Sequence, residues 1–377
     1  MSSGIEQTMA QLFEFPDSEM LPRIDSIRVI NQSLKHIDDR RKGLIKALKT
    51  KYLKLNYWMA GGIELDTIMC VSALSGGGKS TITKTLRDSI AEMNKDLKIK
   101  QLIFNFEMLA HHQASRSLSA KKKMPLRNIY SVDEPLTDEE FEYIKVYYEE
   151  LAKRDIDFVE VSGTAVQIAR TIYGTWRDHC KGTDKILVYE VDHALLTLGK
   201  NGDKEKEKID DLMLALVLTK KKISSEGGHS VGIVLSQMNR EIKKVERRMQ
   251  PELHRPDTSC MMGSSSIEFA CDYIIVAHIP AKLQLPFYGP DKKPTRYKYK
   301  ETPTSDWTIV QIPYFELLKQ RSGEPDLTFA MENLLKYFDF DEMDSAKFKQ
   351  LHQTFEAQGF EGIPELNMTP GINFTKQ

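Results

Sequence analysis

The residues best suited to do chemistry form a glycine-rich turn at positions 72–81, with the sequence SALSGGGKST. Glycines let successive backbone N–H groups converge on a phosphate, and a following helix N-terminus adds a favourable dipole. In such a turn Lys79 would reach the β- and γ-phosphates of a nucleoside triphosphate, and the Ser80 hydroxyl would bind Mg²⁺. The pattern predicts a P-loop for ATP or another nucleoside triphosphate, formed by Ser75, Gly76, Gly77, Gly78, Lys79, Ser80 and Thr81.

The flanks of this turn favour the same interpretation. A strand-like run at 67–71 precedes it and a helix-like run at 82–93 follows it, which is the strand–turn–helix order of a P-loop. One position departs from the pattern, because Ala73 stands where a glycine is usual, so its backbone must have a φ that alanine tolerates. The alternative, a glycine-rich loop that binds nothing, does not account for these flanks.

Nucleotide hydrolysis also needs a carboxylate for the metal and a base that orients water. Asp192 follows the apolar strand expected at 185–191, and Glu190 is its competitor within the same run. Strand register favours Asp192, since the run before it has the character of a core strand. Glu107 follows the strand expected at 101–106, and ligands of open parallel sheets bind at the carboxyl ends of strands. We therefore expect Asp192 and Glu107 at one site.

From residue 51 onward, strand-like and helix-like runs alternate, which predicts an α/β fold with a mostly parallel sheet. Further strands are expected at 156–161, 231–235 and 273–278, with two more runs at 307–312 and 316–319. Helices are expected at 111–120, 137–152, 165–179 and 209–224. Thr137 and Glu140 have the spacing of a capping box at the start of the second helix.

The two ends of the chain differ from this core. Residues 1–20 are expected to form a flexible arm, and 21–50 a helix with a connector. Apolar residues recur every three or four positions over 21–38, with Pro22 in the first turn, so this helix must bury its stripe on its own domain or on a neighbouring subunit. The core is expected over 51–340. Residues 341–377 are expected to form an acidic tail, solvated or in contact with a partner. The acidic stretch begins just before this boundary and contains Asp339, Asp341, Glu342 and Asp344.

The composition limits the binding partners and the cellular compartment that can be expected for this protein. The formal net charge of the 377 residues is −1, so any nucleic-acid contact must come from local loops rather than a global positive field. The four cysteines form no CxxC pair, which disfavours a zinc site or a disulfide framework and fits a reducing cytoplasm. The N-terminus lacks the apolar segment of a signal peptide, and no run reaches the roughly 18 apolar residues of a membrane span. We expect a cytoplasmic protein with no membrane partner.

Several motifs, in order along the chain, resemble those of DnaB-family replicative helicases of the phage type. They are FNFEM at 104–108 with Arg116 on the next helix, LTDEE at 136–140, Asp192-His193, LSQMNR at 235–240, the stretch from Ser266 to Asp272, and KQRSG at 319–323. Together they cover about residues 25–340. About 20 residues precede the first expected helix, so we expect this chain to lack the large N-terminal domain of that family.

The resemblance implies a RecA-like core, a ring of six subunits, and ATP sites at the subunit interfaces. It implies that Glu107 orients the attacking water, Asp192 supports the metal and Gln237 senses the γ-phosphate. Lys319 and Arg321 would then reach into the neighbouring subunit's site, as an arginine finger does. The helix at 21–38 would dock on the adjacent subunit, and single-stranded DNA would lie in the central channel.

Two loops are candidates for contact with DNA. The first, at 199–208, contains Lys200 and Lys204, and the second, at 240–266, contains Arg240, Lys243 and Arg255. Lysine and arginine can bind phosphates without reading bases. Gly263 and Ser264 stand near the point where the family has Arg-Glu, so their backbone amides are the candidates there. The insertion at 280–306 mixes cations with tyrosines over 292–300, which suits stacking of single-stranded nucleic acid or an edge hairpin equally.

The function expected from these observations is an ATP-dependent, ring-forming replicative DNA helicase. Two alternatives stay open at this point: a RecA-type recombinase filament, and a nucleotide-dependent DNA-binding scaffold with little unwinding. Primase, a helicase loader and polymerase are the partners that a replicative role would imply, in a bacterial host cytoplasm if the protein is phage-encoded.

Overall fold

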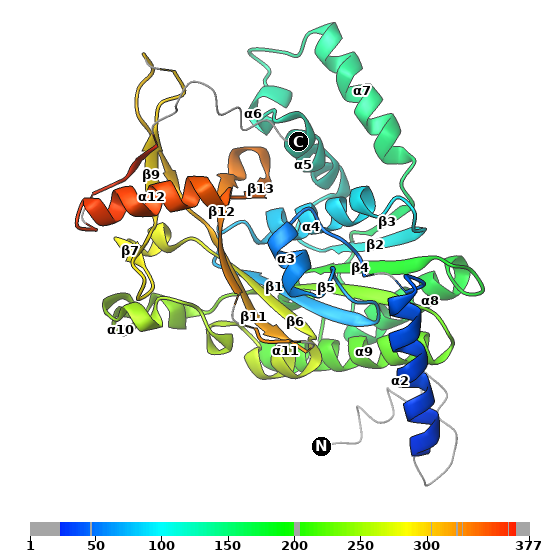
Figure 1. Ribbon diagram of the computed structural model, residues 1–377. Coiled ribbons are helices and arrows are strands. Elements are labelled where there is room, and N and C mark those ends of the chain that lie inside the picture. The colour runs from blue at the N-terminus through cyan, green and yellow to red at the C-terminus, as the bar shows by residue number, and fades with distance from the viewer. Residues whose placement is uncertain are drawn as a thin grey trace.

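A computed structural model describes residues 23–45, 47–199, 204–302, 304–321, 323–325, 327–360 and 362–366. The arm expected at 1–20 lies outside these residues. The fold is built on a nine-stranded sheet with the order β13-β12-β11-β6-β1-β5-β4-β2-β3 (Figure 1). No helix in the described ranges is long and apolar enough to span a membrane.

Six neighbouring strands of this sheet are parallel, as expected. They are β6 (Tyr273–His278), β1 (Thr67–Ala73), β5 (Ser230–Gln237), β4 (Ile186–Asp192), β2 (Ile99–Asn105) and β3 (Ile156–Val159). Three antiparallel strands extend the sheet beyond β6: β11 (Tyr314–Gln320), β12 (Leu327–Leu334) and β13 (Asp339–Glu342). The α/β fold class with a mostly parallel sheet is therefore confirmed.

Helices cover both faces of the sheet, which explains why its central strands are apolar throughout. One face packs against α8 (Ala165–His179), α9 (Glu205–Ser225) and α11 (Ser264–Ala270). The other packs against α3 (Leu53–Trp58) and α4 (Lys79–Met93). A smaller cluster joins α5 (Ala110–Lys122), α6 (Leu126–Ile129) and α7 (Asp138–Ala152). The Thr137–Glu140 capping box at the start of α7 is present as predicted.

The first described helix, α2 (Ser26–Arg41), stands away from the core (Figure 1). It starts later than expected because Asp25 caps it, its carboxylate accepting from the Arg28 N–H at 2.9 Å; Pro22 lies outside the described residues. No residue of α2 is buried, and Ile27, Leu34 and Ile37 are 60–70% exposed. The apolar stripe of α2 is therefore not packed against its own domain.

The expectation of a solvated acidic tail is wrong. Asp339 and Asp341 lie in β13, an edge strand of the main sheet. The Lys51 ammonium lies 2.6 Å from Asp339 and 2.7 Å from Asp341, and the Lys123 ammonium lies 2.8 Å from Asp339. The negative charge that resembled a solvated tail is balanced by lysines distant in sequence.

The C-terminal residues join the insertion in a small module beside the sheet. It contains β7 (Phe287–Tyr288), β8 (Lys293–Pro294), β9 (Arg296–Tyr299), β10 (Thr308–Gln311), α12 (Ser345–Ala357) and β14 (Glu365–Leu366). Strand β9 pairs antiparallel with β10 and parallel with β14. The hairpin considered for this insertion is formed by β9 and β10, and stacking of single-stranded nucleic acid on it stays a prediction.

Candidate active site

The glycine-rich turn connects β1 to α4 at the carboxyl edge of the parallel strands. Positive φ values occur at Gly76 (+68°) and Gly78 (+88°), where L-residues are strained, whereas Ala73 is the last residue of β1 and has no positive φ. The departure at Ala73 therefore costs nothing. A Cβ on Gly78 would lie 2.6 Å from the Phe340 ring, so this position requires glycine for space as well.

A cavity of about 330 Å³ opens above this turn. Residues from four strand ends and from α5 line it, so the fold brings together segments that are far apart in sequence. Of the predicted site residues, those lining it are Ser75, Gly76, Gly78, Lys79, Ser80, Thr81, Glu107, Arg116 and Gln237. Gly77 is not among them; its N–H donates to the Leu74 carbonyl at 2.7 Å and shapes the turn.

Asp192 lies at the base of this site, fully buried, with its Oδ1 4.0 Å from the Lys79 ammonium. Burial raises the pKa of Asp192, and the nearby Lys79 opposes that rise. Neither carboxylate oxygen has a hydrogen-bond partner among the described residues. A buried carboxylate with unused oxygens beside a cavity lined by the Ser80 hydroxyl has the oxygen donors that Mg²⁺ prefers.

Glu190, the competitor of Asp192, has a different environment. Its carboxylate accepts from the Arg87 guanidinium at 3.1 Å, and both side chains are buried. Burial raises the pKa of Glu190 to about 7, against the opposing effect of Arg87. Glu190 is therefore engaged with α4 and does not line the cavity.

His193 contributes to the cavity next to Glu107, and no role was predicted for it from the sequence. Its Nε2 lies 3.9 Å from the Glu107 carboxylate, and its Nδ1 accepts from the Leu195 N–H at 3.3 Å. Burial, together with the Lys79 charge, lowers the pKa of His193 to about 4, so the ring is neutral at pH 7 and carries its hydrogen on Nε2. The sequence signal that could have identified His193 as a site residue is its position directly after Asp192, at the end of β4.

The outer wall of the cavity comes from the segment between β12 and β13. Leu335 and Phe338 line it, and the Arg116 guanidinium lies 4.7 Å from the centre of the Phe338 ring. Sequence reasoning missed both residues, because it placed this segment at the end of the domain rather than over the P-loop. Lys282 also reaches the turn and donates to the Gly76 carbonyl.

Lys319 and Arg321 lie elsewhere in the chain, at the end of antiparallel strand β11. Arg321 donates its backbone N–H to the Asp272 carbonyl at 3.1 Å, and the Asp272 N–H in turn donates to the Ile68 carbonyl at the start of β1. Ile68 is five residues before Ala73, or about 16 Å along the strand. Lys319 and Arg321 therefore lie at the amino ends of the parallel strands, whereas the cavity lies at their carboxyl ends.

The two loops proposed for DNA meet where α9 and α11 begin. Lys204 precedes α9, and Gly263, with φ +68°, precedes α11. A Cβ on Gly263 would lie 2.7 Å from the Ile209 side chain, and Ser266 donates to Asp210, so the two helix starts are in contact. Arg240 and Lys243 are exposed in the short helix after β5, Ser264 is the first residue of α11, and Lys200 lies outside the described residues.

Arg255 is different from the other loop cations. Its guanidinium donates at 2.7 Å to the carboxylate of Glu316, a buried residue of β11 in the main sheet. The ion pair gives Arg255 a structural role in stabilising a buried charge, and its contact with DNA stays a prediction.

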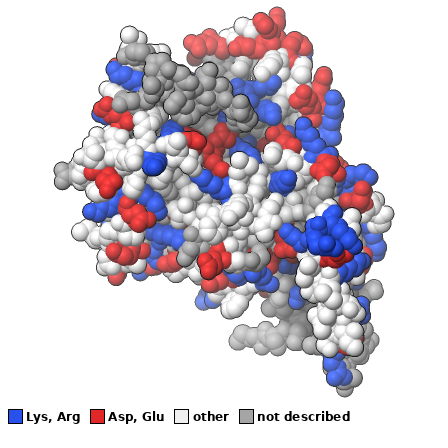
Figure 2. All heavy atoms as spheres, in the orientation of Figure 1, with Lys and Arg blue, Asp and Glu red and all other residues white. Residues whose placement is uncertain are grey.

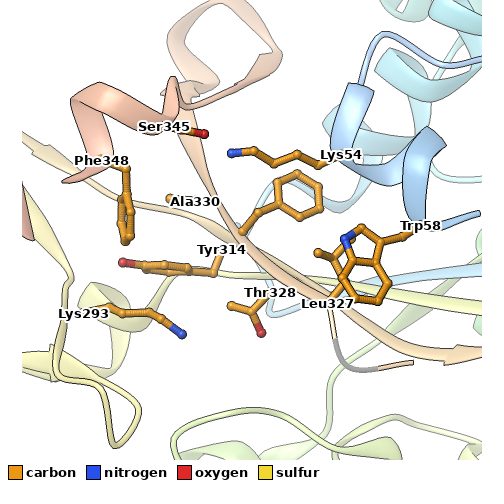
Figure 3. A pocket seen from close by; sticks show the side chains of 10 residues that line it. Lys54, Trp58, Lys293, Tyr314, Leu327, Thr328, Ala330, Ser345 and Phe348 are labelled. Carbon is orange, nitrogen blue, oxygen red and sulfur yellow. The ribbon is translucent and has the colours of Figure 1, made fainter. Parts of the chain in front are cut away.

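A second cavity, of about 210 Å³, lies between α3, the β11–β12 pair and α12 (Figure 3). Trp58, Tyr314 and Phe348 form its aromatic walls, and the Lys54 and Lys293 side chains lie at its edges. None of the predicted site residues lines it. The nucleotide chemistry therefore belongs to the cavity over the P-loop.

A P-loop after the central strand of a mostly parallel sheet, with carboxylates at neighbouring strand ends, defines a RecA-like P-loop ATPase. Residues 47–337 match the family described as the DnaB-like helicase C-terminal domain. The chain therefore belongs to that family of nucleotide-binding replicative helicases, and its activity is that of an ATP-dependent DNA helicase.

Two solved structures show the same fold. One is an isolated ATPase domain, which superposes with a TM-score of 0.63 at 16% identity, over 84% of this chain and 99% of that one. The other is a DnaB-like replicative helicase, from a structure concerned with its interactions with primase. It has a TM-score of 0.62 at 17% identity, over 90% of this chain and 71% of that one. No curated protein matches the chain in sequence. The family match favours the helicase over the recombinase and scaffold alternatives.

Proposed function

We propose that the chain hydrolyses ATP at the interfaces of a six-membered ring and uses the energy to move along single-stranded DNA. The observation that carries this proposal is the separation of Lys79 from Lys319 and Arg321. Within one chain they lie at opposite edges of the sheet, so they can share a nucleotide only if it is bound between two subunits. A head-to-tail arrangement that places one edge against the other forms a ring where the rotation between neighbouring subunits closes, and an open filament where it does not.

Within the cavity, each side chain has a chemical role that fits its position. Lys79 would bind the β- and γ-phosphates, and Ser80 with Asp192 would hold Mg²⁺, which neutralises phosphate charge when bound. Glu107, half exposed at the cavity, would orient the attacking water, and the neutral His193 would donate Nε2–H towards its carboxylate. Gln237, paired in register with Ala73, would sense the γ-phosphate from the neighbouring strand.

The aromatic wall is suited to hold the nucleobase. Phe338 already stacks with the Arg116 guanidinium, and a base could lie against the same ring at the mouth of the cavity. The proposed trans residues Lys319 and Arg321 would complete the site from the adjacent subunit, where they stabilise charge in the transition state.

The exposed stripe of α2 supports the ring as well. On the opposite end of the molecule, α7 exposes Phe141, Tyr143 and Val146, each at 50–54% (Figure 1). Figure 2 shows a basic cluster at one end of α2 and acidic residues gathered over α7. Apolar and charge complementarity therefore favour docking of α2 onto α7 of the neighbouring subunit.

The DNA contact that we propose lies where α9 and α11 start. Lys204, Arg240 and Lys243 supply charge there, and the backbone amides at Gly263 and Ser264 supply hydrogen-bond donors. These groups can bind phosphates without reading sequence, as a translocating motor requires. Primase, a loader or polymerase would bind other surfaces of the ring.

Unwinding of a forked duplex with ATP tests this function. We expect the wild-type protein to unwind the fork, and Glu107→Gln to bind ATP and assemble but not to unwind. Lys79→Ala should abolish ATP turnover. Glu356→Gln, an exposed carboxylate on α12, is the matched control and should unwind normally. Unwinding by Glu107→Gln at the wild-type rate, or open filaments in place of closed six-fold rings in electron micrographs, would contradict the proposal.

A further inference from the structure

The sheet formed by β10, β9 and β14 has one buried face and one outward face. Tyr297, Val310 and Leu366 point to the inside, where they pack with Tyr288 and Tyr314. Side chains alternate along a strand, so the residues between them point outward. The outward residues are Lys298, Lys300, Trp307, Ile309 and Glu365, and the pairs Ile309–Lys298 and Glu365–Lys298 lie directly opposite one another in the register.

A tryptophan flanked by two ammonium groups is the main feature of this outward face. The Lys298 and Lys300 nitrogens lie 5.1 and 5.2 Å from the centre of the Trp307 ring. Trp307 remains 43% exposed, and Ile309 beside it is 56% exposed. Glu365 accepts from Lys298 at 2.8 Å, whereas Lys300 forms no ion pair with any described residue and keeps its ammonium group beside the ring. Exposed Glu301 and Asp306 are the chain neighbours of Lys300 and Trp307.

This combination fits one class of ligand. An exposed aromatic ring stacks on the face of any base, and two nearby ammonium groups pair with the phosphates on either side of it. An apolar protein partner would instead favour a face without lysines, because their desolvation costs free energy on binding.

We propose that the outward face of β9 and β10 is a second binding site for single-stranded DNA, with Trp307 as the stacking residue and Lys298 and Lys300 as the phosphate contacts. It is separate from the nucleotide cavity, none of whose lining residues it contains. It is also separate from the loops at α9 and α11, which lie at a different end of the molecule (Figure 1). A strand leaving the central channel, or the displaced strand of a fork, is the substrate that such a site would hold.

Photo-crosslinking of the full chain to an oligonucleotide carrying 5-iodouracil tests the site directly. Irradiation should join the iodinated base to the peptide that contains Trp307, and an excess of unlabelled oligo(dT) should prevent it. In a Trp58→Phe background, where Trp176 is buried, oligo(dT) should also quench the fluorescence of Trp307. Trp307→Ala should raise the Kd for oligo(dT) about tenfold. Fluorescence anisotropy measures this Kd without relying on the quenching of Trp307. Turnover of ATP without DNA should stay unchanged.

A matched control comes from the other exposed tryptophan. Trp58 is 41% exposed and lies beside Lys54 and Lys293 in the cavity of Figure 3, so Trp58→Ala changes a similar side chain elsewhere. It should leave the crosslink and the Kd unchanged. Lys298→Gln/Lys300→Gln removes charge without removing apolar contacts, and should lower the salt dependence of binding by about one to two in log–log slope.

Three results would overturn the proposal. The first is crosslinking confined to the loops at 240–266, with none at Trp307. The second is an unchanged Kd in both the Trp307→Ala and the double-lysine variants. The third is complete competition by polyglutamate at equal charge, which would identify the face as a site for acidic protein segments instead of DNA. The double-lysine variant keeps the test decisive if Trp307→Ala does not fold.

Discussion

Arg321 forms an ion pair with Asp272, the guanidinium Nε lying 3.0 Å from the carboxylate Oδ1. Asp272 is buried, and its second oxygen accepts from the Ile68 N–H at 2.8 Å and from Lys220 at 2.9 Å. Asp272 thus anchors Arg321 at the amino-end edge of the sheet while leaving the arginine 58% exposed. In this position Arg321 faces outward, and the cavity of its own chain is out of reach.

The first prediction concerns this division of the site between subunits. Arg321→Ala should lower turnover about a thousandfold while ATP affinity changes little, because the finger acts on the transition state. Co-expressed with Lys79→Ala, it should regain activity, since about a quarter of the interfaces then combine an intact Lys79 with an intact Arg321. ATP hydrolysis by the purified mixed rings is the measurement.

The control for this mixture combines Lys79→Ala with Glu107→Gln. Both changes damage the same half of the site, so every interface of the mixed ring is defective and no activity should return. Normal turnover by Arg321→Ala alone would refute the trans role, and so would a co-assembled Arg321/Lys79 mixture that stays inactive.

The second prediction concerns the stripe of α2. Leu34→Asp should dissociate the ring without unfolding the subunit, because Leu34 is 60% exposed in the single chain. ATP turnover should fall when the ring dissociates, because each site then loses the residues that the neighbouring subunit supplies. Gln32→Asp places the same charge on the opposite side of the helix and should leave the ring intact. Light scattering after size exclusion gives the masses, and an intact Leu34→Asp ring would argue against docking through this stripe.

The third prediction concerns Phe338, which has a φ of +52°. Phe338→Gly keeps that backbone conformation without strain and removes only the ring. We expect it to raise the Kd for ATP about tenfold, through loss of stacking at the mouth of the cavity. Phe338→Tyr, which retains an aromatic ring, should bind normally. A fluorescent nucleotide titration measures both, and equal affinities in the two variants would remove Phe338 from the site.

The fourth prediction concerns acid stability. His278 is buried against Tyr288 at 5.4 Å between ring centres, and burial, with a smaller effect of His254, lowers its pKa to about 3. Between pH 6.5 and 3 the unfolded chain binds more protons at this residue than the native one, so stability is lost as the pH falls. From pH 7 to 4.5 the loss is about 2–3 kcal/mol.

His278→Phe should remove that part of the acid sensitivity, because its ring does not titrate. The difference between its urea unfolding free energy and that of the wild type should shift by about 2–3 kcal/mol between the two pH values. His179→Gln changes an exposed histidine and should track the wild type. Parallel pH curves for wild type and His278→Phe would show that His278 does not titrate in this range.

Much of the catalytic half of the site was predictable from the sequence, because it depends on local order. A P-loop needs a strand, a glycine-containing turn and a helix in succession, and residues 67–93 contain all three. Strand ends at Glu107, Asp192 and Gln237 meet at one edge because parallel strands align their carboxyl ends. The limits of α8 and β6 also agree with the sequence prediction, since apolar periodicity and caps are local signals.

Tertiary structure alone decided what depends on distant segments. In the sequence the acids at Asp339 and Asp341 resemble a solvated tail, whereas in the fold they form ion pairs with Lys51 and Lys123. Phe338 lines the cavity because β12 and β13 extend the sheet past the P-loop. Arg255 forms an ion pair with the buried Glu316. Charge and aromaticity are visible in a sequence, but their partners are set by packing across hundreds of residues. The sequence of this protein therefore determined which chemistry is available, and the fold determined where Lys79 and Arg321 each present it.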